Sequence, residues 1–133
     1  MNEQWIESQA VRAVTGAMIE AATRQGLTPD GGCCAYFAPS ECGIAPPEHL
    51  GKVWAIMLFR SPDGKQYANV VAWGKVQWPP QVKVHALGSF SAVVEQGRKL
   101  TREKARKGYC DSYSLMRARW KARVGDRPLL YPA

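Results

Sequence analysis

The sequence lacks several features that would assign it to a common functional class. No run of apolar residues approaches the roughly 20 needed to cross a bilayer. The opening segment, MNEQWIESQA, is too polar and acidic for a secretory signal. We therefore expect a cytoplasmic protein with no membrane partner. No Gly-rich phosphate loop, zinc-protease motif, serine-hydrolase motif or paired-carboxylate motif occurs, so the sequence predicts no enzymatic activity.

Cysteine and histidine are too few, and too irregularly spaced, for a recognisable metal site. The cysteines are Cys33, Cys34, Cys42 and Cys110, and none of them forms the C-x-x-C spacing of structural zinc sites. Without a secretory signal, reduced thiols are expected rather than disulfides. A thiol enzyme that pairs one of the first three cysteines with His49 is left open as an alternative. We expect no metal and no cofactor.

The basic charge is concentrated in the last third of the chain. The sequence contains 18 Lys and Arg against 11 Asp and Glu, a formal net charge of +7. Residues 98–127 alone have a net charge of +8, whereas the remaining residues sum to −1. Such asymmetry favours a polyanionic partner, above all a nucleic acid. The competing interpretation is an ordinary solvated helix face.

The hydrophobic pattern predicts an α+β fold in a single domain. Apolar residues recur at helical spacing over residues 3–25, where Asn2 can cap an N-terminal amphipathic helix. The stripe is Ile6, Ala10, Ala13, Val14, Ala17, Met18 and Ala21. Residues 52–59 and 66–77 are typical of two strands joined by a turn at 61–64, and residues 81–87 of a third. A helix follows at 90–106, capped by Ser89, with an apolar face of Phe90, Val93, Val94, Gly97 and Leu100.

Four segments make up the expected domain of 133 residues. They are an N-terminal helix at 1–26, a Gly-, Pro- and Cys-rich connection at 27–51, a core at 52–111 and a basic segment at 112–133. Tyr36 and Phe37 are expected to pin the connection to the core, in a short strand. Residues 112–124 fit either a short helix or a strand.

Several short motifs in the core are similar to those of one known family. A K-x-W-x-I-x-L strand begins at Lys52, and a second strand ends in Trp73-Gly74-Lys75. A third strand leads into Gly88-Ser89-Phe90, and the following helix ends in Lys107-Gly108-Tyr109. Over residues 52–111 the chain therefore resembles a WGR domain, the small module named for a Trp-Gly-Arg tripeptide. WGR domains occur in DNA-dependent poly(ADP-ribose) polymerases and in some bacterial proteins.

The resemblance implies a twisted antiparallel β-sheet with one helix packed across it. In the polymerases, the tripeptide Trp and Arg contact the terminal nucleotide of a DNA end, and the module does no chemistry. By position, those residues are Trp73 and Lys75 here. The tripeptide is Trp-Gly-Lys in this chain, and lysine binds phosphate as a point charge rather than through a planar fork.

The predicted nucleic-acid surface combines aromatic rings that can stack on bases with basic side chains that can contact phosphates. Arg98, Arg102 and Arg106 repeat every four residues and are expected to share one helix face, and four basic residues near Trp120 alternate along residues 117–123. The full set is Trp73, Lys75, Trp78, Lys83, Arg98, Lys99, Arg102, Arg106, Lys107, Arg117, Arg119, Lys121 and Arg123.

The sequence therefore predicts a non-catalytic module that binds nucleic acid, with DNA ends, nicks or backbone favoured over RNA. The alternative is a small protein-interaction or inhibitor module of a mobile element, which docks on a larger nucleic-acid-handling complex. The Ala-rich N-terminal helix and the Pro-rich connection would then supply the interface. The sequence leaves the oligomeric state open.

Overall fold

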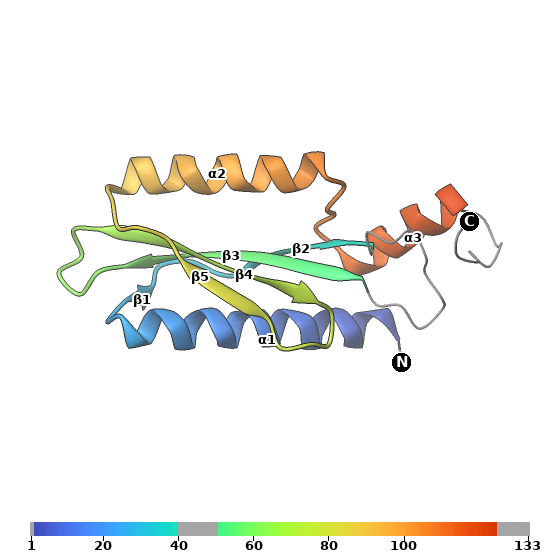
Figure 1. Cartoon of the computed structure of the whole chain (residues 1–133), viewed down its shortest axis with the longest axis horizontal. Helices are drawn as coiled ribbons and strands as arrows, with labels where there is room; N and C mark the ends of the chain where they lie inside the picture. The colour runs from blue at the N-terminus through green and yellow to red at the C-terminus, as the bar shows by residue number, and fades with distance from the viewer. Residues whose placement is uncertain (1, 40–50, 125–133) are drawn as a thin grey trace.

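The computed structural model describes residues 2–39 and 51–124, and for residues 120–124 it describes the backbone alone. Its elements are α1 (Glu3–Arg24), β1 (Thr28–Pro29), β2 (Cys34–Ala38), β3 (Lys52–Arg60), β4 (Tyr67–Lys75), β5 (Gln81–Val84), α2 (Phe90–Arg106) and α3 (Tyr113–Val124). The strands form one antiparallel sheet in the order β1-β3-β4-β5, and β2 also pairs with β3. Helix α1 covers one face of the sheet and α2 the other (Figure 1). The expected α+β class is confirmed.

The β3–β4 hairpin organises the sheet. Its register pairs Lys52 with Lys75 at the open end and Arg60 with Tyr67 beside the turn. The turn is held by Asp63, whose Oδ1 accepts the Ser61 hydroxyl at 2.5 Å and the backbone N–H of residue 65 at 2.9 Å. These hydrogen bonds, the one from Ser61 foremost, hold the pKa of Asp63 below its usual value. The two strands lie within two residues of their expected bounds.

The third strand is shorter than its sequence pattern predicts, since β5 ends at Val84 rather than at residue 87. After Val84 the chain makes one more bond to β4, from the His85 N–H to the Asn69 carbonyl at 2.9 Å. It next meets the sheet at an isolated bridge between Gly88 and Tyr67. The segment therefore leaves the ladder between these two contacts and turns into α2.

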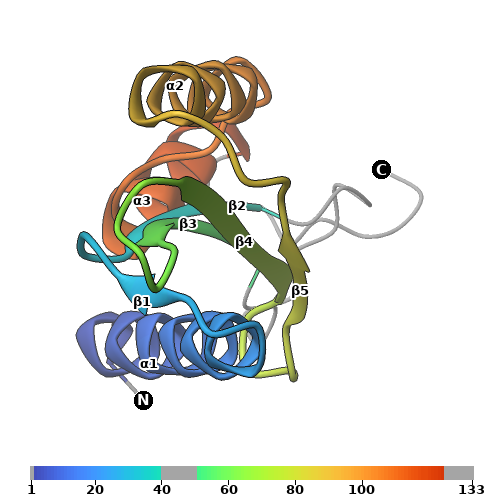
Figure 2. The ribbon, with the colours of Figure 1, turned by 90° about the vertical axis from the view of Figure 1, so that its left-hand side faces the viewer.

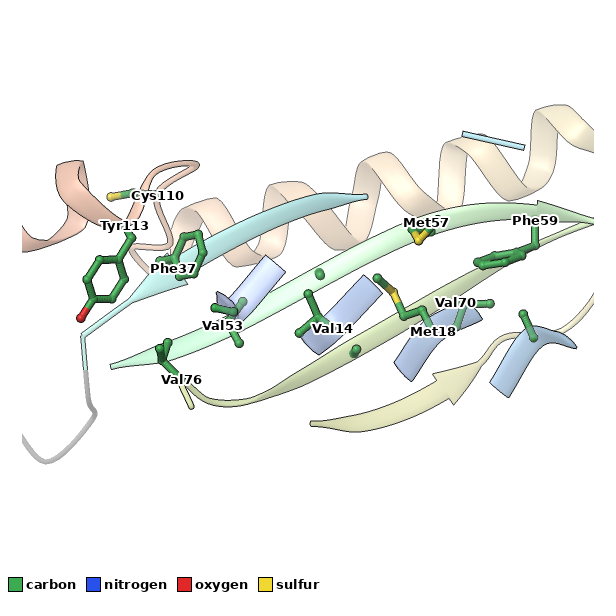
Figure 3. Packing of buried hydrophobic residues seen from close by; sticks show 14 of the residues in the cluster. Val14, Met18, Phe37, Val53, Met57, Phe59, Val70, Val76, Cys110 and Tyr113 are labelled. Atoms are coloured by element: carbon green, nitrogen blue, oxygen red, sulfur yellow. The ribbon is translucent and has the colours of Figure 1, made fainter. Parts of the chain in front are cut away.

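Helix α1 buries one stripe against the sheet. Asn2 caps it as expected, because its Oδ1 accepts the Trp5 N–H at 2.7 Å. The buried residues are Ile6, Ala10, Val14, Met18 and Ala22, spaced four apart. They join the strand residues of the main core, which include Val53, Met57, Phe59 and Val70 (Figure 3). The expected stripe was wrong in detail: Ala13 is exposed, and Ala17 and Ala21 are half-buried, because the contact follows i+4 steps.

Helix α2 begins at its expected N-cap, where the Ser89 hydroxyl accepts the Ala92 N–H at 3.3 Å. Of the helix residues, Val93 alone is buried. Phe90, expected on the buried face, is 52% exposed and meets the sheet only through an edge-to-face contact with Tyr67, with ring centroids 5.1 Å apart. Farther along the helix, Leu100 is half-buried, as expected of the apolar face, and packs against a second buried cluster formed by Trp54, Ile56 and Val71 of the sheet.

Asn69 of β4 is the polar anchor of α2. It is buried, and its Nδ2 donates to the Val93 carbonyl at 2.8 Å and to Gln96 Oε1 at 2.9 Å. A Cβ at Gly97 would lie 3.2 Å from Asn69 Oδ1, so glycine allows the helix to approach β4 at this point. Asn69 thus anchors the first half of the helix to β4.

The connection forms the expected strand at Tyr36 and Phe37, as part of β2. The backbone of Phe37 exchanges hydrogen bonds with Cys110, at 2.6 and 2.7 Å, and its ring meets Tyr113 edge to face. Residues 113–124 form a helix, one of the two expected forms, and Glu7 Oε1 of α1 accepts the Tyr113 N–H at the start of α3. Cys42 and His49 lie outside the described residues. Among the helices of residues 2–39 and 51–124, none combines the length and the hydrophobicity that spanning a bilayer requires.

Candidate nucleic-acid interface

The Trp-Gly-Lys tripeptide forms the last three residues of β4. Trp73 is half-buried and lies opposite Trp54 in the hairpin register, and Lys75 is exposed opposite Lys52. Because alternate strand residues share a face, Trp73 and Lys75 both lie on the α2 side of the sheet. Gly74 has φ +156°, and a Cβ there would lie 3.6 Å from Pro80 Cα. The positive φ favours glycine here, and the β4–β5 loop lies at van der Waals distance from this position.

Three aromatic rings, including that of Trp73 in the tripeptide, lie near two lysines at this end of the sheet. We call this group the aromatic–lysine cluster, and its members are Trp54, Trp73, Tyr109, Lys52 and Lys104. Lys104 Nζ lies 5.7 Å from the Trp54 ring centroid and 5.5 Å from that of Tyr109. Lys52 Nζ lies 5.8 Å from the Tyr109 ring centroid. Each contact is a cation–π interaction worth about 0.5–1 kcal/mol at an exposed site. The rings therefore hold two ammonium groups near a half-exposed tryptophan.

Four members of this cluster, Lys52, Trp54, Lys104 and Tyr109, are absent from the set predicted from the sequence. The signal for two of them was present in the hairpin. A turn at 61–64 places the K-x-W at the start of β3 directly opposite the W-G-K at the end of β4. No comparable signal existed for Lys104, because its position depends on where α2 crosses the sheet.

The β4–β5 loop presents the most exposed large apolar side chain of the described residues. Trp78 is 67% exposed, and its N–H bonds to the Lys75 carbonyl at 3.0 Å. The preceding Gln77 has φ +71°, so the turn adopts a left-handed step that ordinary residues avoid. Trp78 is therefore displayed close in sequence and space to Lys75.

Lys83 is exposed near the middle of β5 and faces the α2 side, since Val82 and Val84 pack into the main core. Burial, and secondarily the charge of Lys83, lower the pKa of His85. Gln96 Nε2 lies 3.5 Å from His85 Nδ1, which suits the neutral ring as an acceptor. His85 therefore adds no charge to this side at neutral pH.

Of the three arginines of α2, two line a groove and the third lies farther around the helix. Four residues advance a helix about 40° beyond one full turn, so Arg106 lies about 80° around the axis from Arg98. Arg98 and Arg102 line a groove on the β2 side of the helix. Arg102 also pairs with Glu95 at 3.4 Å, with both side chains more than half exposed.

The other basic residues of this region lie on the flank of α2 away from the groove or at the C-terminal end of the helix. Lys99 follows Gln96 by one helical step of three residues, which puts it on the β5 flank of the helix. Arg106 and Lys107 are exposed at the C-terminal end, immediately after Lys104. These side chains and Lys83 do not line the groove.

Helix α3 uses its described arginines for internal contacts. Arg117 Nε lies 3.9 Å from Glu3 Oε1, and its side chain is only 16% exposed. Arg119 is exposed but its Nη1 donates to Cys110 Sγ at 3.3 Å. Both contacts hold α3 against the rest of the protein. The side chains of Lys121 and Arg123, also predicted as contacts, lie outside the described residues.

The three described cysteines, Cys33, Cys34 and Cys110, are free thiols that differ in exposure, with Cys34 exposed and Cys110 buried. Cys33 is half-buried, and burial raises the pKa of its thiol, while a hydrogen bond with Thr15 opposes the rise. Residues 2–39 and 51–124 contain no group of three or more His, Cys, Asp or Glu side chains placed to hold a metal ion.

Comparison with known protein families matches the part of the chain that contains the cluster. A family model described as the WGR domain matches residues 47–115, more than half of the chain. The matched range contains β3, β4, β5 and α2, and with them every member of the aromatic–lysine cluster. No curated protein and no solved structure matches the chain. WGR domains are nucleic-acid-binding modules, and this chain belongs to the WGR domain family.

Proposed function

We propose that the chain is a non-catalytic DNA-binding module that engages the end or a nick of a duplex at the aromatic–lysine cluster. The observation that carries this proposal is the convergence of Trp73, Lys75, Lys52 and Lys104 at one end of the sheet. A strand terminus offers an unstacked base or sugar and a phosphate, which are the groups that a half-exposed ring and ammonium groups recognise.

The electrostatics of α2 support a broader contact with the duplex backbone. Arg106 and Lys107 extend the positive surface beyond Lys104, while Lys83 and Lys99 extend it along β5 and the near flank of the helix. Phosphate contacts of this kind steer association and do not depend on base sequence. Affinity is therefore expected to fall steeply with salt and to vary little between duplex sequences.

The proposal is tested by fluorescence anisotropy on a blunt DNA duplex and on the same duplex sealed by hairpin loops at both ends. We expect tighter binding to the open duplex and to a nicked duplex with a 5′-phosphate. A matched RNA duplex, expected to bind more weakly, tests the preference for DNA. Equal affinity for open and sealed DNA would exclude end recognition, and no binding at low salt would exclude the nucleic-acid role.

Two variants link the affinity to the cluster. Trp73→Leu keeps an apolar side chain against Trp54 but removes the stacking ring, and we expect about tenfold weaker binding to the open duplex. Lys65→Gln, at the hairpin turn on the opposite end of the sheet, is the control and should bind as the wild type does. Thermal unfolding of each variant separates loss of contact from loss of folding.

The alternative of a protein-docking module built on the N-terminal helix has less support. The apolar stripe of α1 packs against the protein's own sheet, which leaves Trp5 and Ile19 as its exposed large apolar side chains. Light scattering on the purified protein tests this alternative, because a stable dimer lost in Trp5→Ser would favour α1 as an interface.

A further inference from the structure

A groove of about 510 Å³ lies between α2 and the β2 side of the sheet, apart from the aromatic–lysine cluster. Its floor includes Tyr36, Ile56 and Leu58, and its wall includes Val94 and Thr101 of α2. The lining is thus largely apolar, and it is large enough for one bulky side chain and part of the backbone beside it.

The groove lies on the β2 side of the line along which α2 meets β4. Asn69 and Val93 hold the helix over β4. On the β2 side, the side chain of Thr101 forms a hydrogen bond with that of Tyr36, and both residues line the groove. The mouth lies at Gly31 and Gly32, where an added Cβ would meet no atom within 4 Å. β1 and the loop after it lie at the edge of the sheet opposite β5 (Figure 2).

The edge of β2 next to the groove carries unused backbone groups. The N–H and C=O of Phe37 point away from β3, since both bond to Cys110. By the alternation of a strand, the N–H and C=O of Ala35 point outward as well, and no backbone group in the described ranges pairs with them. Ala35 lies between Cys34 and Tyr36, which both line the groove. An extended segment pairing there would place alternate side chains on the groove side.

The rim of the groove is positively charged. Arg98 and Arg102 stand one helical turn apart on its wall, and Arg98 has no acidic partner among the described residues. Arg102 pairs with Glu95, but an exposed pair at 3.4 Å is worth only about 0–1 kcal/mol and can be exchanged. Asp30 is the acidic residue at the mouth. The positive charge of Arg98 and Arg102 on the wall therefore favours a partner segment that carries carboxylate side chains.

We propose that this groove binds an extended, acidic segment of another protein, which adds to the edge of β2 and inserts one large apolar side chain under α2. An aliphatic floor with a single ring, Tyr36, suits a leucine or phenylalanine side chain better than a run of stacked bases. Trp73 and Lys75 do not line the groove, although its floor residue Tyr36 contacts Trp54 of the aromatic–lysine cluster, with ring centroids 5.9 Å apart. The proposal rests on the groove residues and not on the proposed DNA function, so the failure of one leaves the other standing.

The test starts from a phage-displayed library of random peptides, selected on the full chain and counter-selected on Arg98→Glu/Arg102→Glu. We expect a consensus with a large apolar residue flanked by Asp or Glu. A synthetic consensus peptide should bind the double variant roughly tenfold more weakly than the wild type. Lys99→Glu/Arg106→Glu, which changes the net charge equally on other faces of α2, is the matched control and should bind the peptide normally.

Cys34 reports where the peptide binds, because its thiol is exposed and lines the groove. In a Cys33→Ser background, the consensus peptide should slow alkylation of Cys34 by iodoacetamide, and a blunt DNA duplex should not. If single-stranded DNA protected Cys34 from alkylation and no peptide did, the proposal would be overturned and the groove would be assigned to nucleic acid. The absence of a consensus, or binding that ignores Arg98→Glu/Arg102→Glu, would overturn it as well.

Discussion

Removing two lysine charges from the cluster should change the salt dependence of DNA binding by a definite amount. Lys75→Gln removes an exposed charge, and Lys104→Met keeps an unbranched stem over Trp54 without the ammonium group. Each phosphate neutralised by a lysine contributes about 0.9 to the slope of log K against log salt. The double variant should therefore lower the magnitude of that slope by about 1.8. At about 0.1 M salt, its affinity should fall roughly 60-fold.

The assay is anisotropy of a labelled blunt duplex over a series of salt concentrations, with the wild type and Lys65→Gln measured alongside. Lys104→Met also loses cation–π contacts worth about 0.5–1 kcal/mol each, so its melting temperature should drop by a few degrees while the fold is kept. A folded double variant with an unchanged slope would refute the reasoning, because the lysines would then make no phosphate contact.

Three further predictions concern stability. Asn69→Ala should lower the free energy of unfolding in urea by about 2–3 kcal/mol, since it removes the buried hydrogen bond to the Val93 carbonyl; an unchanged midpoint would show that α2 is anchored elsewhere. The pKa of His85 lies below 6.5 because of burial, so its contribution to stability is complete above that pH and is lost as the pH falls through the lower folded-state pKa. His85→Gln should flatten this part of the stability–pH curve, and a curve that kept its slope would assign the loss to other groups. Gly74→Val forces a side chain onto φ +156° beside Pro80 and should cost about 1–3 kcal/mol by thermal unfolding, whereas a neutral result would mean that the loop moves freely.

Local signals were sufficient where chain neighbours decide the structure. Asn2 and Ser89 marked the starts of α1 and α2, and the turn at 61–64 identified the hairpin. These features depend on groups within a few residues of one another, such as a capping oxygen and the N–H three positions on. The pairing of Lys52 with Lys75 follows from the same turn.

Structural features that depend on contacts between residues far apart in the chain could not be predicted from local sequence signals. The position of Lys104 over Trp54 depends on Asn69, which holds α2 through a hydrogen bond to the carbonyl of Val93, 24 positions later in the chain. The helical state of residues 113–124 is supported by the Glu7 carboxylate, which accepts the Tyr113 N–H from more than a hundred positions away. Arg98, Arg102 and Arg106 share a helical spacing, so the sequence does not show which of them line the groove. That depends on how α2 lies on the sheet.

Burial of the α1 stripe has a practical consequence for the limits of the folding unit. The family match begins at residue 47, yet Val14, Met18 and Ala22 of α1 and Phe37 of β2 belong to the same buried core as the matched strands. A fragment cut to residues 47–115 would expose one entire apolar face of the sheet to solvent. Such a fragment should aggregate on expression, and α1 supplied separately as a peptide should restore its solubility.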